Sequence, residues 1–301
     1  MQTLTEPDAP TATLRGREHE GEFPLSVHAL ACGHEAEALS YLAARPLHTV
    51  YMAGLIHDNG LVNAHNRGTF YACRDASGRF AGLALIGHVT QIEARTGAAL
   101  KAFARVAQQC STAHVIMGVH EEVCAFWQHY AEAGQTLRLV CRELLLEQRR
   151  PVEAGEAVPE LRPATAAELP LVLPVQSGMA EAECGVNPLA VDPEGFRARC
   201  ARRIARGRTW VVVEQGTLIF KADIMAETAE AVYLEGIYVN EQARGRRLGR
   251  RCLQQLGRIL LSRARAICLL VNEQHQEAQA FYLKAGYRVH SLYDTIYLYK
   301  G

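Results

Sequence analysis

The sequence predicts two α+β domains in tandem, each with a mixed, mostly antiparallel sheet flanked by helices. The length of 301 residues corresponds to two domains of about 150 residues each. The segment EQRRPVEAGEAVPE at 147–160 is rich in Pro, Glu and Gly, as domain linkers are. Apolar runs on both sides follow one order: strand, helix, two or three antiparallel strands, helix, strand, helix, strand. We therefore expect four parts: a flexible arm at 1–22, a first domain at 23–150, a linker at 151–159 and a second domain at 160–301.

In the first half, the expected strands and helices alternate from residue 25 onward. LSVHAL (25–30) has a strand pattern, and residues 34–58 are mostly helical. Further strands are expected in TFYACRD, in GRFAGLALIGHVTQIE after a turn at Ala76-Ser77-Gly78, in AHVIMGVH and in LRLVCRELLLE. GAALKAFARVAQQC and EVCAFWQHYAEAG are expected to be helices.

The second half has stronger periodicity. A short strand (160–165) and a helix broken at Pro174 precede an amphipathic helix at 193–207. Strands follow at 209–214 and 217–226, and Gln215-Gly216 between them indicates a hairpin. The remaining elements are expected to be a strand at 231–240, an amphipathic helix at 248–264, a buried strand at 266–272, a helix at 276–286 and a strand at 291–299.

Charge and composition narrow the class of protein. Lys plus Arg and Asp plus Glu are both 32, and only four of the 32 basic residues are lysines. Residues 1–155 hold 13 basic and 16 acidic residues, a net charge of −3, which the second half balances with +3. A neutral chain with 49% apolar residues is neither disordered nor a coat for nucleic acid.

The cysteines and the apolar runs suggest the compartment. Nine scattered cysteines without a CxxC pair form neither a disulfide framework nor a zinc knuckle, and HxxxH and HEH patterns are absent, so we expect no metal. No apolar run approaches the ~20 residues of a membrane helix, and the first residues lack an apolar signal core. We expect a protein of the reducing cytoplasm that does not contact a membrane.

The most informative segment is LEGIYVNEQARGRRLGRRCLQQL, in which a strand leads through an arginine–glycine loop into a helix. Five arginines lie within residues 244–251. Unpaired N–H groups at a helix N-terminus, the helix dipole and arginines together suit a pyrophosphate, and Gly245 and Gly249 would let a ligand approach the backbone. The lysine–serine/threonine pair of a P-loop is absent, which argues against nucleotide hydrolysis. A plain connection or a nucleic-acid patch remain the alternatives for this loop.

This loop and the segment LLVNEQHQEAQAFYLKAGY at 269–287 resemble the GNAT N-acetyltransferase superfamily. Arg244 and Gly249 match the family's phosphate loop, whereas Arg247 stands where the family has an inner glycine. Tyr282, Lys284, Gly286 and Tyr287 match a second signature, whereas His275 stands where the family often has asparagine. RIARGRTWVVVEQGTLIFKADI also resembles a bacterial two-domain subgroup whose N-terminal domain, of unknown function, is itself GNAT-like but degenerate. The first half has no counterpart of the glycine loop.

The resemblance implies tandem GNAT folds, acetyl-CoA as acyl donor and a cleft between two splayed parallel strands of the second half. The residues that would contact the cofactor are Ile237, Tyr238, Val239, Arg244, Gly245, Arg246, Arg247, Leu248, Gly249, Arg250, Asn272 and His275.

Tyr282 is the candidate acid, because a phenol with a pKa near ~10 can protonate a leaving thiolate. Glu235 is the candidate base, expected on the same strand face as Ile237 and Val239. Glu183, Lys221 and Asp223 are the candidate acceptor-binding residues. The alternatives are a packed aromatic for Tyr282, an ion pair for Glu235, a solvated loop for Glu183, and a solvated sheet face or a mutual network for Lys221 and Asp223.

The leading hypothesis is an N-acetyltransferase that transfers the acetyl group to a small-molecule or peptide amine by direct attack in a ternary complex. The alternative is a non-catalytic acyl-CoA sensor or interaction module, motivated by Arg247 and His275. We expect no nucleic-acid partner, and the sequence leaves room for a homodimer.

Overall fold

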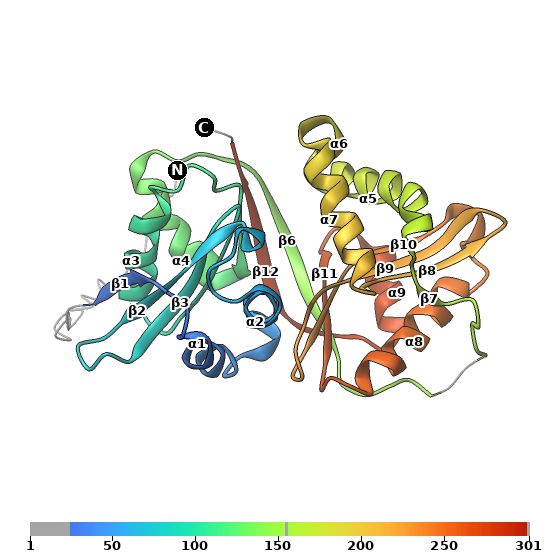
Figure 1. Ribbon diagram of the computed structural model, residues 1–301, viewed down its shortest axis with the longest axis horizontal. Helices are drawn as coiled ribbons and strands as arrows, with labels where there is room; N and C mark the ends of the chain where they lie inside the picture. Colours follow the sequence, from blue (N-terminus) through green and yellow to red (C-terminus); the bar gives the residue numbers. More distant parts are fainter. Residues whose placement is uncertain (1–24, 154–155, 300–301) are drawn as a thin grey trace, which may run out of the picture.

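A computed structural model describes residues 25–153 and 156–299, so the expected arm at 1–22 lies outside the described residues. Twelve strands form one sheet in the order β1-β2-β3-β4-β5-β12-β6-β11-β10-β9-β8-β7. Helices cover this sheet as two lobes, and the long strands β6 and β12 run between the lobes (Figure 1). The predicted α+β class and the mostly antiparallel sheet are confirmed. Over the same ranges, no helix is long and apolar enough to cross a bilayer.

The first half follows the predicted order. Its strands are β1 (Ser26–Ala29), β2 (Gly68–Arg74), β3 (Phe80–Gly87), β4 (Val89–Ala94), β5 (Val115–Val119) and β6 (Leu137–Gln148). Its α-helices are α1 (Glu35–Leu42), α2 (Pro46–Asn59), α3 (Gly97–Ala107) and α4 (His120–Tyr130). The side chains of α1 and α2 pack on one face of β2 and β3, and those of α3 and α4 pack on the other.

The second half also follows its predicted order. Its strands are β7 (Arg162–Pro163), β8 (Thr209–Glu214), β9 (Thr217–Glu227), β10 (Val232–Val239), β11 (Ile267–Asn272) and β12 (Arg288–Leu298). Its α-helices are α5 (Leu169–Cys184), α6 (Pro188–Val191), α7 (Pro193–Ala205), α8 (Leu248–Leu261) and α9 (Gln276–Lys284). Helices α5 and α7 pack on one face of the sheet, whereas α8 and α9 pack on the other.

Two local predictions have different outcomes. Gln215 and Gly216 both have positive φ, 48° and 75°, as the two-residue hairpin turn between β8 and β9 requires. The predicted break at Pro174 is wrong, because α5 continues through this residue. Pro174 is exposed, so solvent can reach the backbone around the missing N–H donor.

The final strands of the two halves are exchanged, which the sequence pattern does not predict. β12, at the end of the second half, pairs antiparallel with β5 of the first half. β6, at the end of the first half, pairs antiparallel with β11 of the second half. β6 and β12 also pair with each other, from Arg288–Glu147 to Leu298–Leu137. Each half therefore completes the other's sheet.

Helix α2 strengthens this junction. Its Leu47 and Val50 pack with Leu145 of β6 and with Ala226 and Tyr233 of the second half. At its end, Asp58 forms ion pairs with Arg206 and Arg208. The two lobes are therefore joined by side chains as well as by the exchanged strands.

Candidate functional site

The candidate site of the second half begins where β10 and β11 separate. These parallel strands pair at Val232–Ile267, Tyr233–Cys268 and Leu234–Leu269, and no pair follows although β10 continues to Val239. The gap between them is the splay that the resemblance implies.

A bulge in β10 changes which side chains face the splay. Glu235 pairs with Asp223 of β9 and Tyr238 pairs with Lys221, so β10 holds one extra residue over this stretch. Gly236, at φ 60°, has the left-handed conformation that such a bulge favours. Beyond it Ile237 packs toward α8 and Tyr238 packs toward α5 and α7. The prediction that Glu235 shares a face with Ile237 and Val239 is therefore wrong, because one inserted residue reverses the alternation.

The loop after β10 places an uncapped helix end beside the splay. Arg247 precedes α8 in the left-handed conformation, with φ 60° and ψ 1°, and its side chain does not cap the helix. The first N–H groups of α8 are therefore available to an anion, and the helix dipole adds partial positive charge there.

A cavity of about 1050 Å³ lies between this loop, the end of β10 and helix α9. Eight of the predicted cofactor residues line it: Ile237, Val239, Arg244, Gly245, Arg247, Gly249, Arg250 and His275. Four others, Tyr238, Arg246, Leu248 and Asn272, do not line it. Tyr238 and Leu248 pack into the cores on either side of the sheet, and the Asn272 carboxamide accepts a hydrogen bond from the Gln274 N–H.

The arginines of the loop have different surroundings. Arg244, Arg247 and Arg250 line the cavity, and Arg250 Nε is buried without a hydrogen-bond partner among the described residues. Arg251 instead donates to the carbonyl oxygens of Glu156 and Ala157. An orphaned guanidinium N–H and an uncapped helix end both fit a bound phosphate group.

Gly249 is required for packing. A Cβ atom at this position would lie 2.5 Å from Val239 Cγ2, so the absence of a side chain lets α8 lie against β10. The sequence predicted this glycine for ligand approach; Gly249 lines the cavity and in addition makes this helix–strand contact.

Tyr282, the candidate acid, lies on α9 and lines the cavity. Burial raises its pKa to about 12, so the phenol stays protonated at neutral pH. Its ring contacts Phe281 and Tyr287 edge to face.

Three carboxyl groups gather on the other face of the sheet, where the two halves meet. They belong to Glu235 on β10, Glu183 on α5 and Glu143 on β6. Burial, with Glu183 nearby, raises the pKa of Glu235 to about 7, and burial raises that of Glu143 to about 7 and that of Glu183 to about 6. Thr295 donates to Glu143 at 2.5 Å, and the Tyr297 hydroxyl lies 3.4 Å from Glu183.

Lys221 and Asp223 form the mutual network that the sequence left as an alternative. Both are buried, with Lys221 Nζ 2.6 Å from Asp223 Oδ2 and 2.8 Å from the carbonyl oxygen of Gly236. Burial alone would raise the pKa of Asp223, but Lys221 and Arg203 hold it below the usual value. The pair therefore anchors the bulge in β10 and does not form an open wall of the site.

Sequence reasoning missed part of the cavity wall. The additional lining residues are Ala243, Gln274, Gln276, Glu277, Ala278, Phe281 and Lys284. Lys284 and the start of α9 could have been predicted, because they lie inside the motif at 269–287. Which face of α9 meets the cavity depends on how the helix packs, and the motif does not show that.

Comparison with known proteins identifies this half. The acetyltransferase (GNAT) domain family matches residues 205–289, which include β10, the arginine loop and α9. This segment is therefore GNAT-like in sequence. No sequence among curated proteins matches the chain.

Solved structures extend the likeness over the whole chain. A Drosophila protein superposes with a TM-score of 0.62 at 12% identity, covering 91% of this chain and 98% of that protein. A tandem GNAT protein from the clavulanic acid biosynthesis pathway gives 0.57 at 13%, covering 91% and 98%. A GNAT-family acetyltransferase from Colwellia psychrerythraea gives 0.53 at 11%, covering 91% and 100%. At these identities the likeness establishes the tandem GNAT fold.

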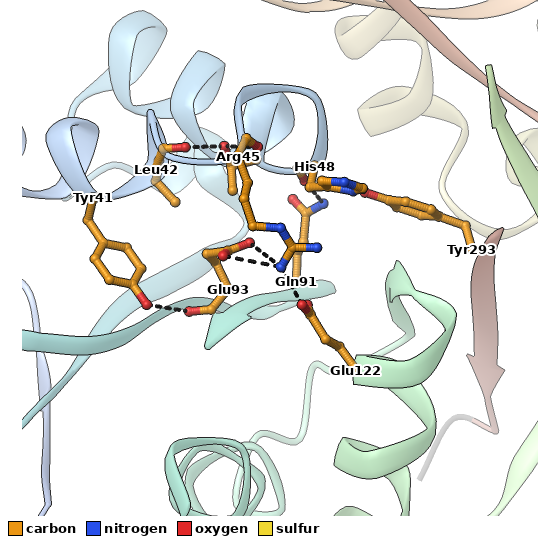
Figure 2. Close-up of polar contacts among 9 residues, drawn as sticks. Tyr41, Leu42, Arg45, His48, Gln91, Glu93, Glu122 and Tyr293 are labelled. Carbon is orange, nitrogen blue, oxygen red and sulfur yellow. Dashed lines mark hydrogen bonds and ion pairs between the residues drawn. The ribbon is translucent and has the colours of Figure 1, made fainter. Parts of the chain in front are cut away.

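In the first half, the corresponding splay is closed. Strands β4 and β5 pair at Val89–Val115 and Thr90–Ile116, and no further pair follows. Beyond this point Arg45 forms ion pairs with Glu93 of β4 and with Glu122 of α4, which lie on the two sides of the opening (Figure 2). The cavity left beneath has a volume of about 10 Å³.

The helix that follows β4 is closed as well. Thr96 caps α3 by accepting a hydrogen bond from the Ala99 N–H at 3.2 Å. Unlike the second half, the first half thus offers neither an open splay nor an uncapped N-terminus on the helix beside that splay.

Proposed function

We propose that the GNAT domain transfers the acetyl group of acetyl-CoA to an amine by direct attack in a ternary complex. The observation that carries this proposal is the open cavity where β10 and β11 part, bounded by the uncapped N-terminus of α8 on one side and Tyr282 on the other.

In this proposal, Arg244, Arg247, Arg250 and the N–H groups of α8 hold the cofactor phosphates. Three cationic side chains and a helix N-terminus provide charge and donors that match a pyrophosphate. The pantetheine arm then enters the splay beside Ile237 and Val239. Acetyl-CoA supplies the activated acyl group, and the bulged backbone near Ile237 supplies an N–H donor for the thioester oxygen.

Tyr282 protonates the leaving sulfur. With its pKa raised to about 12 the phenol carries its proton throughout the neutral range, and it lines the same cavity as Ile237 and Val239.

The amine approaches from the face that bears Glu235 and Glu183. A carboxyl group with a pKa of about 7 can take a proton from the attacking ammonium, directly or through water, once it is itself ionised. Glu183 and Glu143 nearby would attract a cationic acceptor.

Titration calorimetry with acetyl-CoA tests the donor site. The double variant Arg244→Ala/Arg250→Ala should weaken binding by about 10- to 100-fold, because two charge-assisted phosphate contacts are lost. Arg246→Ala is the matched control and should bind normally, since this side chain does not line the cavity. Equal affinity in all three proteins would contradict the proposal.

An acyl-CoA sensor is the second candidate, and Arg247 favours it. This residue occupies a left-handed position that glycine adopts more readily, so the loop departs from the usual GNAT pattern. Thiol release measured over a panel of amines separates the two functions. Binding of acetyl-CoA without turnover of any amine, unchanged by Tyr282→Phe, would support the sensor.

A further inference from the structure

A second cluster of chemically reactive side chains lies outside the GNAT cavity, where α4 meets the exchanged strand β12. His120 and Cys124 are four residues apart on α4 and so share one face of the helix. Asp294 of β12 lies against them, with its carboxylate 2.7 Å from His120 Nδ1.

The ligand atoms of the three side chains all lie within 4.8 Å of one another, close enough to share one metal ion. Cys124 Sγ lies 3.5 Å from His120 Nδ1 and 3.8 Å from Asp294 Oδ2, so one nitrogen, one sulfur and one oxygen face a common point. Zinc with ligand distances of about 2.0 to 2.3 Å has tetrahedral edges of about 3.3 to 3.5 Å. The two Sγ distances lie near these edges, whereas His120 Nδ1 and Asp294 Oδ2, which are 2.7 Å apart, would move apart by about 0.6 Å to bind the same ion.

The neighbouring arginine binds the other oxygen of Asp294 and not the oxygen that faces His120 and Cys124. Arg142 Nε donates to the other carboxylate oxygen, Asp294 Oδ1, at 3.0 Å and so fixes the plane of the carboxylate. Its Nη2 also lies 3.2 Å from His120 Nδ1, a contact that a metal ion would replace. Glu273 lies near Arg142 and Glu121 lies near Cys124, so the carboxylates of Asp294, Glu273 and Glu121 outnumber the single guanidinium.

We propose that His120, Cys124 and Asp294 bind a zinc ion with one position left for water or a further ligand. The mixed nitrogen, sulfur and oxygen set suits zinc or another late divalent transition metal and is unsuited to magnesium or calcium. Cys124 lies at the surface, which gives an incoming ion access, whereas Asp294 is buried and fixed. The expectation of no metal was based on spacing along the chain, and Asp294 lies 170 residues beyond Cys124.

The ion would join the last strand of the chain to a helix of the first half. β12 reaches β5 and α4 only because the final strands are exchanged. Zinc would thus link the exchanged strand to α4. When the free zinc concentration exceeds the Kd by 10- to 100-fold, binding would raise the free energy of unfolding by about 1 to 3 kcal/mol.

Cobalt substitution tests the site in the full chain with any purification tag removed. Co²⁺ added to the metal-free protein should bind with one equivalent per chain and produce a near-ultraviolet thiolate-to-cobalt charge-transfer band together with tetrahedral d–d bands. Cys124→Ser should abolish the charge-transfer band, and Asp294→Asn should weaken binding by about 10-fold or more. Zinc should displace the cobalt and raise the thermal midpoint.

Two controls keep the test independent of folding. Cys110→Ser removes another partly exposed thiol, whose Sγ lies 3.4 Å from the Thr112 hydroxyl, and His129→Ala removes another histidine of α4, paired with Glu132. Both variants should retain the cobalt spectrum of the unmodified protein. A charge-transfer band that persists in Cys124→Ser, or the absence of stoichiometric binding by the unmodified protein, would overturn the proposal.

Discussion

The two halves of the molecule share one topology, and they differ at the point where their parallel strands part. In the second half the opening between β10 and β11 holds a cavity of about 1050 Å³, whereas the opening between β4 and β5 holds about 10 Å³. Three local features account for the difference. In the second half β10 contains a bulge, whereas in the first half β4 pairs regularly with β3. The N-terminus of α8 is uncapped, whereas Thr96 caps that of α3. In the first half, Arg45 also bridges the two sides of the opening. The fold therefore provides the splay, and a few residues decide whether it becomes a binding site.

The largest effect on turnover is expected at one helix position that holds tyrosine in the second half and phenylalanine in the first. Tyr282 is the seventh residue of α9, and the seventh residue of α4 is Phe126, which is buried in the closed cavity. Tyr282→Phe gives the second half the side chain of the first. We expect kcat to fall by about 100-fold or more, because the leaving thiolate loses its proton donor, while calorimetry should show unchanged affinity for acetyl-CoA.

Tyr287→Phe is the matched control for this change. Its hydroxyl is buried beside Tyr282 without a hydrogen-bond partner among the described residues, and it does not line the cavity. This variant should turn over normally. If Tyr282→Phe also did so, the assignment of the acid would be refuted.

The pH dependence of turnover examines the opposite face of the sheet. A general base works only when ionised, so kcat/KM for the amine should be low below pH 7 and rise through about 7, where Glu235 and its neighbours titrate as a group. Glu235→Gln should lower kcat/KM above pH 7 by about 100-fold and flatten the rise. Glu230→Gln changes a partly exposed turn residue that pairs with Arg265, and it should leave the profile unchanged. A full rise in Glu235→Gln would assign the base elsewhere.

Removing the bridge from the first half should destabilise it without creating a second site. Arg45→Met leaves Glu93 and Glu122 facing each other unpaired, and we expect a loss of about 2 kcal/mol in the free energy of unfolding by urea. Arg79→Met removes an exposed ion pair with Asp75 on a turn, and it should change the free energy of unfolding by less than about 0.5 kcal/mol. Because α3 keeps its cap, acetyl-CoA should still bind with one equivalent per chain. A second equivalent would show that the bridge alone excludes the cofactor.

The smallest effect concerns the loop that distinguishes this GNAT domain from its family pattern. Residue 247 has φ 60°, a left-handed conformation that glycine adopts more readily than arginine. We therefore expect Arg247→Gly to raise the free energy of unfolding by up to about 1 kcal/mol. Affinity for acetyl-CoA should fall slightly, because one cationic side chain leaves the cavity. Denaturant unfolding and calorimetry on the same preparation measure both effects. A loss of stability would mean that the Arg247 side chain holds the loop.

Patterns along the chain predicted most elements and failed where partners are distant in sequence. The turn at Gln215-Gly216 and the buried stripe of α8 with Cys252, Leu256 and Leu260 follow from local rules, and the structure contains both. The exchange of β6 and β12 depends on which neighbouring strand each one pairs with, and the alternation of apolar and polar residues along a strand does not predict its partner.

The candidate site shows the same division. The arginine loop and Tyr282 were predicted from contiguous motifs, and they line one cavity. The face of Glu235 was predicted wrongly because a single bulged residue at Gly236 reverses it. The burial of Lys221 with Asp223 could not be predicted either, because alternation along β9 does not show which face α5 and α7 cover.

The exchanged strands also set an order on biosynthesis. While the ribosome is still making the second half, the gap beside β5 has no strand to fill it, because β12 is the last strand to emerge. The first half therefore keeps an open sheet edge until the residues of β12, 288–298, have been translated. A stop codon only a few residues before Asp294 would consequently damage the half that was made first as much as the half that was cut.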